Sequence, residues 1–208
     1  DLYVVDGQQR LTTSIILIQA ILESVPKDAE INYQSLKEIE GRYILYKATD
    51  GQRNSFLFGY EKDNPSDEFL KTKIFGTHSH SNLYQQTLYT HNLQGSKDCF
   101  KKKLSTMAIE DIAILFKKLT QKFKFNLYEI SDEVDVFVTF ETMNNRGKPL
   151  TSLELLKNRL IYLSTLFREH DGREVLRNKI NNVWKAIYEY LGKNPDAPLS
   201  DKIGRAHV

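Results

Sequence analysis

The chain has 208 residues, of which 40% are hydrophobic and 27% are charged, so it can bury the core of a globular protein. Its 29 basic and 27 acidic residues give a net charge of +2, which excludes nucleic-acid binding driven by overall charge but leaves a local basic patch open. A single cysteine, Cys99, excludes an intrachain disulfide and a cysteine-based zinc cluster. No apolar run is long enough to cross a membrane, and we expect a cytoplasmic protein without a membrane partner.

Both ends of the sequence suggest a fragment. The chain opens without methionine in a strand-like segment, and residues 203–208 resemble the translation of a common sequencing-adapter oligonucleotide. We expect one truncated domain over residues 1–201, with a strand–helix–hairpin part over 1–60 and a mainly helical part over 61–192. We treat 203–208 as an adapter-derived tail without an evolved role.

The most informative stretch is D-G-Q-Q-R-L-T-T at Asp6–Thr13. A short apolar run precedes it and an apolar helical pattern follows, which predicts a strand-to-helix turn. Unpaired backbone N–H groups and the helix dipole favour an anion there, Arg10 can fork onto phosphate oxygens, and Gly7 lets the backbone approach closely. The motif therefore predicts a phosphate-bearing ligand. The alternative is a plain Asp-Gly junction, because most such turns bind nothing.

The pattern then predicts a helix from about Leu11 to Val25, ended by Pro26. The helix is apolar nearly all round, so we expect it to be buried at the domain centre; one apolar stripe consists of Leu11, Ile15, Ile18, Leu22 and Val25. Aromatic and β-branched runs at 42–46 and 55–58 flank an Asp-Gly turn and predict a β-hairpin. Ser66 or Asp67 could cap a short helix.

Later segments are mostly helical. Helices are expected over about 82–104 and 109–122, and the alternation at 123–130 predicts a half-buried strand. Residues 132–143 alternate like a strand, but an acidic first turn favours a helix. A capping box at 151–154 opens a helix with an inward stripe at Leu153, Leu156, Leu160, Leu163 and Phe167. A last helix from about Arg173 is expected to point Leu176, Ile180, Val183, Trp184, Ile187 and Leu191 inward, before Gly192 and Pro195 end it.

A second polar motif joins two of these helices at Phe140–Leu150. A bare helix–loop–helix explains Gly147 as a left-handed helix end and Pro149 as a stop. It does not explain why amides and cations, Asn144 and Arg146 among them, crowd the loop. Such a cluster suits phosphate oxygens or a base edge.

Other polar groups give weaker signals. His78, His80 and His91 do not follow metal-ligand spacing, so no metal site is predicted, and Cys99 is not predicted to be a nucleophile. A set of lysines could contact the phosphate backbone of a nucleic acid: Lys101, Lys102, Lys103, Lys117, Lys118, Lys122 and Lys124. Lysine runs are nevertheless usually solvated helix faces.

D-G-Q-Q-R-L-T-T, followed about 130 residues later by F-x-x-x-N-x-R-G-x-x-L, resembles the N-terminal domain of GmrSD-type modification-dependent restriction enzymes. The same domain occurs in related anti-phage proteins of the phosphorothioate-sensing SspE type. The match spans essentially residues 1–192. Asp6, Gly7, Gln8, Gln9 and Arg10 match the first motif, and the second is matched by Phe140, Asn144, Arg146, Gly147 and Leu150.

The resemblance implies an α+β fold: a small ParB- and sulfiredoxin-like mixed sheet core with a β-hairpin and a predominantly α-helical remainder. It implies a regulatory and sensing domain of DNA restriction that binds and hydrolyses a nucleoside triphosphate (GTP, ATP, UTP or CTP), with Mg²⁺ as a candidate ion. Its expected partners are modified DNA, through the full-length protein, and a C-terminal HNH-type nuclease domain in cis or in trans. The family's usual opening I-P-x-x-Q-R-like segment and the nuclease domain are not in this sequence.

The resulting hypothesis assigns catalysis to Asp6, Gln8, Gln9 and Arg10, and nucleotide binding to Gly7, Arg10, Asn144, Arg146 and Gly147. Arg10 and the helix N–H groups would hold phosphates, while Asp6 would orient water or Mg²⁺ and the two glutamines would position the attacking water or a phosphate oxygen. No G-x-x-x-x-G-K-[ST] motif occurs, so this is not a P-loop enzyme. Two alternatives remain: a DNA-binding sensor without hydrolysis, and a structural adaptor.

Overall fold

A computed structural model describes residues 4, 7–47, 54–60, 65–77, 86–127, 129, 152–165 and 170–194. The chain divides into two compact units. Gln9–Asn126 forms the larger unit, and Asp1–Gln8 together with Leu127–Val208 forms the smaller unit. None of the helices in the described ranges is long and apolar enough to cross a membrane.

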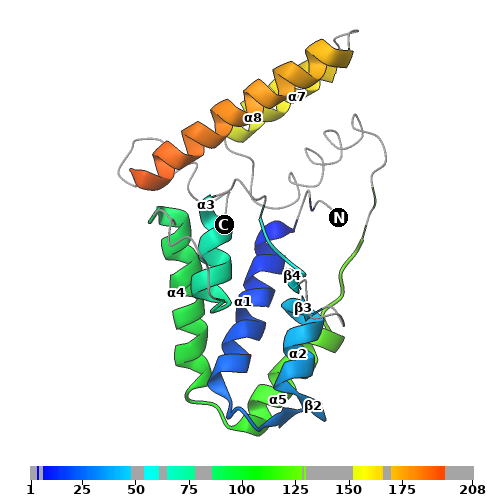
Figure 1. The fold of residues 1–208 in the computed structure, drawn as a ribbon, viewed down its shortest axis with the longest axis vertical. Helices are drawn as coiled ribbons and strands as arrows, with labels where there is room; N and C mark the ends of the chain where they lie inside the picture. The colour runs from blue at the N-terminus through cyan, green and yellow to red at the C-terminus, as the bar shows by residue number, and fades with distance from the viewer. Residues whose placement is uncertain are drawn as a thin grey trace. The chain divides into compact units, whose positions relative to one another are not determined.

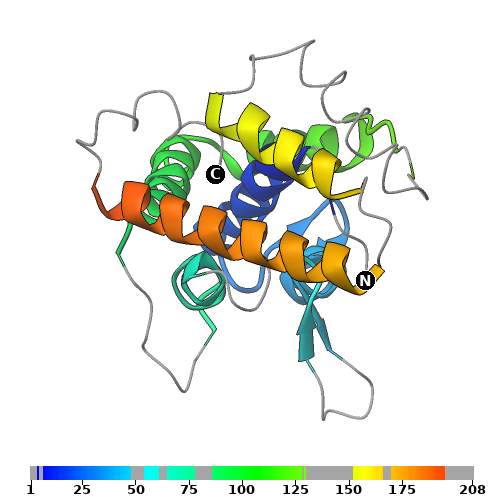
Figure 2. The same ribbon diagram turned by 90° about the horizontal axis from the view of Figure 1, so that it is seen from above.

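The larger unit is built around one central helix. Figures 1 and 2 show α1 in the middle of the unit, with the other helices around it. In chain order its elements are α1 (Gln8–Ser24), β1 (Glu30–Ile31), β2 (Gln34–Ser35), α2 (Leu36–Tyr43), β3 (Leu45–Lys47), β4 (Asn54–Phe56), α3 (Pro65–Phe69), the π-helix η1 (Leu70–Ile74), α4 (Leu88–Leu104) and α5 (Ile109–Gln121). The smaller unit contains α7 (Ser152–Thr165) and α8 (His170–Lys193).

These elements confirm an α+β fold in which helices predominate. The strands form two antiparallel pairs, β1–β2 and β3–β4. The mixed sheet implied by the resemblance is not among the described residues.

Helix α1 supplies much of the core, as predicted. Ile16, Ala20 and Ile21 are at most 1% exposed. Within the apolar stripe named from sequence, Ile18 and Val25 are buried, while Leu11, Ile15 and Leu22 are half-buried. The most buried face instead runs through Thr12, Ile16, Gln19 and Ala20. A helix that is apolar nearly all round does not reveal from sequence which side faces inward.

A short hairpin and an unpredicted helix follow α1. Ile31 pairs with Gln34 across a two-residue turn in which Asn32 (φ 51°) and Tyr33 (φ 64°) are both left-handed, as a type I′ turn requires. Ser35 then caps α2: its hydroxyl accepts from the Glu38 backbone N–H at 3.3 Å, and the Glu38 carboxylate accepts from the Ser35 N–H at 2.7 Å. The hairpin and the capping box together start a helix where none was expected.

The larger hairpin is confirmed, with one correction. β3 and β4 are antiparallel, with Leu45 opposite Phe56 and Lys47 opposite Asn54. Arg42 and Tyr43, which the aromatic run placed in the first strand, belong to α2 instead. The cap outweighs their strand propensity because it satisfies the N–H groups that begin the helix.

The chain then forms a short helix that widens into a π-helical turn. α3 begins at Pro65, so Ser66 and Asp67 lie in its first turn rather than at a cap position. Asp67 is buried, and its carboxylate accepts from the Tyr60 backbone N–H at 3.1 Å and pairs with the Lys71 ammonium group.

A buried lysine joins three elements of the larger unit. The Lys97 side chain, on α4, is 8% exposed, and its ammonium group lies 2.7 Å from the Glu23 carboxylate of α1. It also donates to the backbone carbonyls of Lys73 (3.1 Å) and Ile74 (2.6 Å) at the end of η1. Glu23 accepts further bonds from Gln19 (2.9 Å) and Lys101 (3.2 Å). This group, here called the Lys97–Glu23 network, was not anticipated from sequence.

The two middle helices are confirmed. α4 begins at Leu88, after Thr87 and Thr90 cap each other reciprocally, and α5 covers Ile109–Gln121. The predicted strand at 123–130 is wrong where the chain is described. Residues 123–127 follow α5 without regular structure, and Phe123, Phe125 and Leu127 are 61%, 62% and 88% exposed. The alternation is real, but the described part of the chain contains no partner strand for it.

In the smaller unit, α7 and α8 form a helical hairpin. Ile161, Ile180 and Trp184 pack as its centre, with Leu153, Leu160, Leu176 and Tyr188 against them. The Arg177 guanidinium donates to the buried Ser164 hydroxyl at 3.1 Å. Three residues predicted to point inward are exposed instead: Leu156, Leu163 and Val183. The helix expected at 132–143 and the cap residue Thr151 lie outside the described residues.

Candidate functional site

The first motif forms a turn that leads directly into α1. Gly7 has φ 87°, a left-handed conformation that suits glycine, and α1 begins at the next residue. The predicted turn and the helix after it are therefore present, with the helix starting at Gln8 rather than at Leu11. The strand predicted before the turn is not seen in the described part of the chain, where Val4 has no regular structure. Asp6 lies outside the described residues.

Three polar side chains open the helix. Gln8, Gln9 and Arg10 are all exposed. The Gln8 amide donates to the Val4 carbonyl at 2.5 Å, which links the first helical turn to the segment before Gly7. The first turn contains no acidic residue, so no carboxylate there competes with an external anion for the positive end of the helix. These features favour a negatively charged ligand.

A buried polar group lies further along the same helix. The Thr12 side chain is 2% exposed and lies beside the Tyr60 hydroxyl. Burial raises the pKa of Tyr60, and the nearby Asp67 carboxylate adds to the rise, while the Thr12 contact partly offsets it. Tyr60 is therefore a neutral phenol at physiological pH. Sequence reasoning missed this group because its members meet only through tertiary packing.

The second motif cannot be placed against the first. Asn144, Arg146 and Gly147 lie outside the described residues, as do Phe140 and Leu150. The nucleotide-binding role assigned to these residues therefore stays a prediction.

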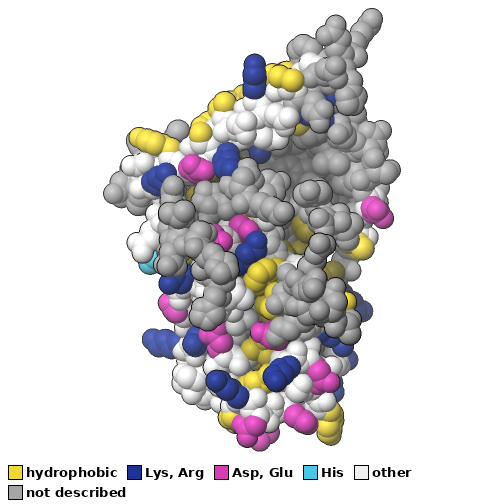
Figure 3. All heavy atoms as spheres, in the orientation of Figure 1, with side chains coloured by type: hydrophobic (Ala, Val, Ile, Leu, Met, Phe, Trp, Pro, Cys, Tyr) yellow, Lys and Arg dark blue, Asp and Glu magenta, His cyan; other side chains and the backbone are white. Residues whose placement is uncertain are grey.

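Among the described residues, charged side chains of both signs share the visible surface. On the face shown in Figure 3, lysines and arginines alternate with acidic residues. The candidate phosphate-contacting lysines are exposed, but they fall at two places: 101–103 end α4, and Lys117, Lys118, Lys122 and Lys124 lie on or just after the second half of α5. Lys101 is also held by Glu23.

A metal site finds no support in the described ranges. No three histidine, cysteine or carboxylate side chains there come close enough together to hold an ion. His91 is exposed on α4, and His78 and His80 lie outside these ranges. Cys99 is exposed.

Comparison with known proteins identifies one family. No curated protein and no solved structure matches the chain significantly. The family described as "GmrSD restriction endonuclease, N-terminal domain" matches residues 1–161, which is most of the chain and includes both motifs. The protein therefore belongs to the GmrSD restriction endonuclease N-terminal domain family, and is a domain of a DNA restriction system that defends against phage.

Proposed function

We propose that this domain binds and hydrolyses a nucleoside triphosphate and thereby regulates a modification-dependent nuclease. The observation that carries the proposal is the start of α1, where a left-handed Gly7 leads into an exposed turn containing Gln9 and Arg10. A first helical turn with a guanidinium group and no acidic residue is suited to phosphate oxygens.

The side chains of this turn have distinct roles. Arg10 and the first backbone N–H groups hold the phosphates, where positioned charge supplies most of the rate of phosphoryl transfer. Gln9 orients the attacking water. Gln8, whose amide is bonded to the Val4 carbonyl, acts by holding the turn in shape. Mg²⁺, held by Asp6, would neutralise charge on the phosphates.

The second motif would complete the site. In this proposal Asn144 and Arg146 supply an amide and a guanidinium group to the nucleotide, and Gly147 is assigned to nucleotide binding with them. The motif would then pass the presence of a nucleotide to a downstream HNH-type nuclease domain. Recognition of modified DNA is assigned to the full-length protein.

The test compares the full-length protein with its Arg10→Ala variant, using fluorescent analogues of the four nucleoside triphosphates and phosphate release with Mg²⁺. Lys27→Ala, an exposed cation beyond the other end of α1, is the matched control. We expect Arg10→Ala to weaken nucleotide binding by roughly tenfold or more, which is about the contribution of one charged hydrogen bond. Turnover should decrease as well. Unchanged binding and turnover in Arg10→Ala would refute the assignment.

The second candidate is a DNA-binding sensor without hydrolysis. It is favoured by the exposed lysines around the second half of α5, since phosphate contacts give affinity without nucleotide chemistry. Salt-dependent binding of modified DNA by a protein that turns over no nucleoside triphosphate would support this candidate over the first.

A further inference from the structure

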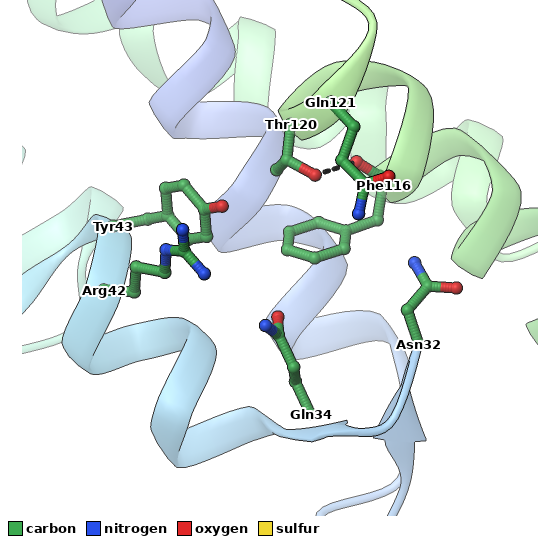
Figure 4. Close-up of a pocket in the computed structure, with 7 residues that line it drawn as sticks. All are labelled: Asn32, Gln34, Arg42, Tyr43, Phe116, Thr120 and Gln121. Atoms are coloured by element: carbon green, nitrogen blue, oxygen red, sulfur yellow. Dashed lines mark hydrogen bonds between the residues drawn. The ribbon is translucent and has the colours of Figure 1, made fainter.

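A small hollow lies between the first hairpin, α2 and α5. Its volume is about 90 Å³, and Figure 4 shows its lining: Asn32, Gln34, Arg42, Tyr43, Phe116, Thr120 and Gln121. Two rings meet edge to face in it, since the Tyr43 and Phe116 centroids are 5.9 Å apart at 89°. The Arg42 guanidinium lies 5.7 Å from the Tyr43 ring centroid. The lining of the hollow therefore contains two aromatic rings and a guanidinium group beside one of them.

The remaining lining is rich in amides and contains no carboxylate. The Asn32 amide nitrogen donates to the Ala113 carbonyl at 2.9 Å, which pins the hairpin to α5. The amides of Gln34 and Gln121 make no hydrogen bond within the described residues, and Figure 4 shows them on either side of the Phe116 ring. An amide offers a donor and an acceptor together, which matches the edge of a nucleobase.

Exposed aromatic and basic side chains continue from this hollow. Phe123 follows Gln121 by two residues, and its ring centroid lies 6.4 Å from that of Phe125. Both rings are more than half exposed, and exposed lysines at 122 and 124 alternate with them. No acidic residue occurs from Ile112 to Leu127. Tyr33, at the tip of the adjacent hairpin, is 99% exposed in its left-handed conformation.

We propose that this surface, formed by the hollow and residues 122–125, binds an unpaired DNA strand. Bases stack on Phe123 and Phe125, the lysines contact the backbone phosphates, and the amides of the hollow contact one base edge. Interleaved rings and cations are typical of single-strand binding, because the faces of bases are accessible only outside the duplex. DNA is the partner favoured here because the family acts in DNA restriction and no acidic side chain opposes phosphates on residues 112–127. The inference deepens the DNA-binding candidate and does not depend on nucleotide binding.

The test is fluorescence anisotropy with a labelled 20-nucleotide strand and with its duplex, at low and moderate salt, using the full 208-residue chain. We expect Phe123→Ala with Phe125→Ala to weaken single-strand binding roughly thirtyfold or more, as the loss of two stacking rings predicts. Lys122→Gln with Lys124→Gln should reduce the slope of log affinity against log salt by about 1.4, since each single-strand phosphate contact contributes about 0.7. The control is Lys102→Gln with Lys103→Gln, which removes the same charge at the end of α4 and should change neither quantity.

Three further results decide the proposal. Tyr33→Gly removes an exposed ring at a turn that favours glycine, so it should weaken the complex while the chain stays folded. Arg10→Ala should leave strand binding unchanged, which separates this surface from the nucleotide site. Equal affinity for the single strand and the duplex would overturn the proposal. So would a Phe123→Ala, Phe125→Ala variant that binds the strand normally and differs only in self-association of the chain.

Discussion

The two ends of α1 differ in how they are held. At its C-terminal end, Glu23 receives bonds from Gln19, Lys97 and Lys101, and the apolar residues before it are buried. At its N-terminal end, Gln8, Gln9 and Arg10 are exposed, and the side chain of Gln8 donates to the nearby Val4 carbonyl. One helix thus has an anchored end and an accessible end.

This difference suggests how the domain can present a polar motif at little cost to its stability. Burial and the Lys97–Glu23 network fix the direction of the helix axis. The helix start can then hold backbone N–H groups and Arg10 in place without being part of the core. A site on a rigid helix positions a ligand more accurately than a site on a free loop.

The largest expected effect comes from breaking the anchored end. Lys97→Met should destabilise the protein by about 2–3 kcal/mol, because it removes the hydrogen bonds to two carbonyls of η1 and the ion pair with Glu23 at a largely buried site. Urea unfolding followed by circular dichroism measures the change. Lys103→Met, on the exposed face of the same helix, should stay within about 0.5 kcal/mol. Equal changes in the unfolding free energy of the two variants would show that the Lys97–Glu23 network does not anchor α1.

A matched pair of glutamines compares the ends directly. Gln19→Ala should cost about 1 kcal/mol, because Gln19 is 8% exposed and donates to Glu23. Gln8→Ala should cost less than about 0.5 kcal/mol, because the Gln8 side chain is exposed and takes no part in the core. The same urea titration measures both variants. A larger cost at Gln8 would reverse the comparison.

The smallest expected effect is a dependence on pH. Burial tends to raise the pKa of Glu23, but hydrogen bonds from Gln19, Lys97 and Lys101 outweigh it and hold the pKa below the ordinary 4.5. A lowered pKa in the folded state stabilises the protein fully above the unfolded value, and this contribution is lost as pH falls through the folded value. The free energy of unfolding should therefore decrease more between pH 6 and a pH below 4 for the natural protein than for Glu23→Gln. Parallel curves would show that Glu23 is not linked to folding.

Sequence patterns predicted the long elements because these depend on local periodicity. α1, α4, α5, α7, α8 and the β3–β4 hairpin lie close to their expected positions. α2 was missed although Ser35 and Glu38 show a capping-box spacing, because the aromatic run at 42–46 resembles a strand. That spacing is the signal that could have found it.

Features that depend on distant partners were not predictable. Lys97 and Glu23 are far apart in sequence, and neither shows a local pattern that indicates burial. The alternation at 123–127 predicts a strand only if another strand is available to pair with it. For the candidate site, the turn at Gly7 and the exposed start of α1 follow from the motif. The position of Tyr60 beside Thr12 and near Asp67 comes from the fold alone.

The central claim is that the accessible end of α1 binds a nucleoside triphosphate while the anchored end stays unchanged. Hydrogen exchange measured by mass spectrometry, with and without each of the four nucleotides and Mg²⁺, tests it most directly. The account predicts new protection of the amides over Gln8–Thr13, with Ile16–Ser24 exchanging slowly in every condition. Nucleotide-induced protection confined to other parts of the chain, or no protection at Gln8–Thr13 with any of the four, would contradict it.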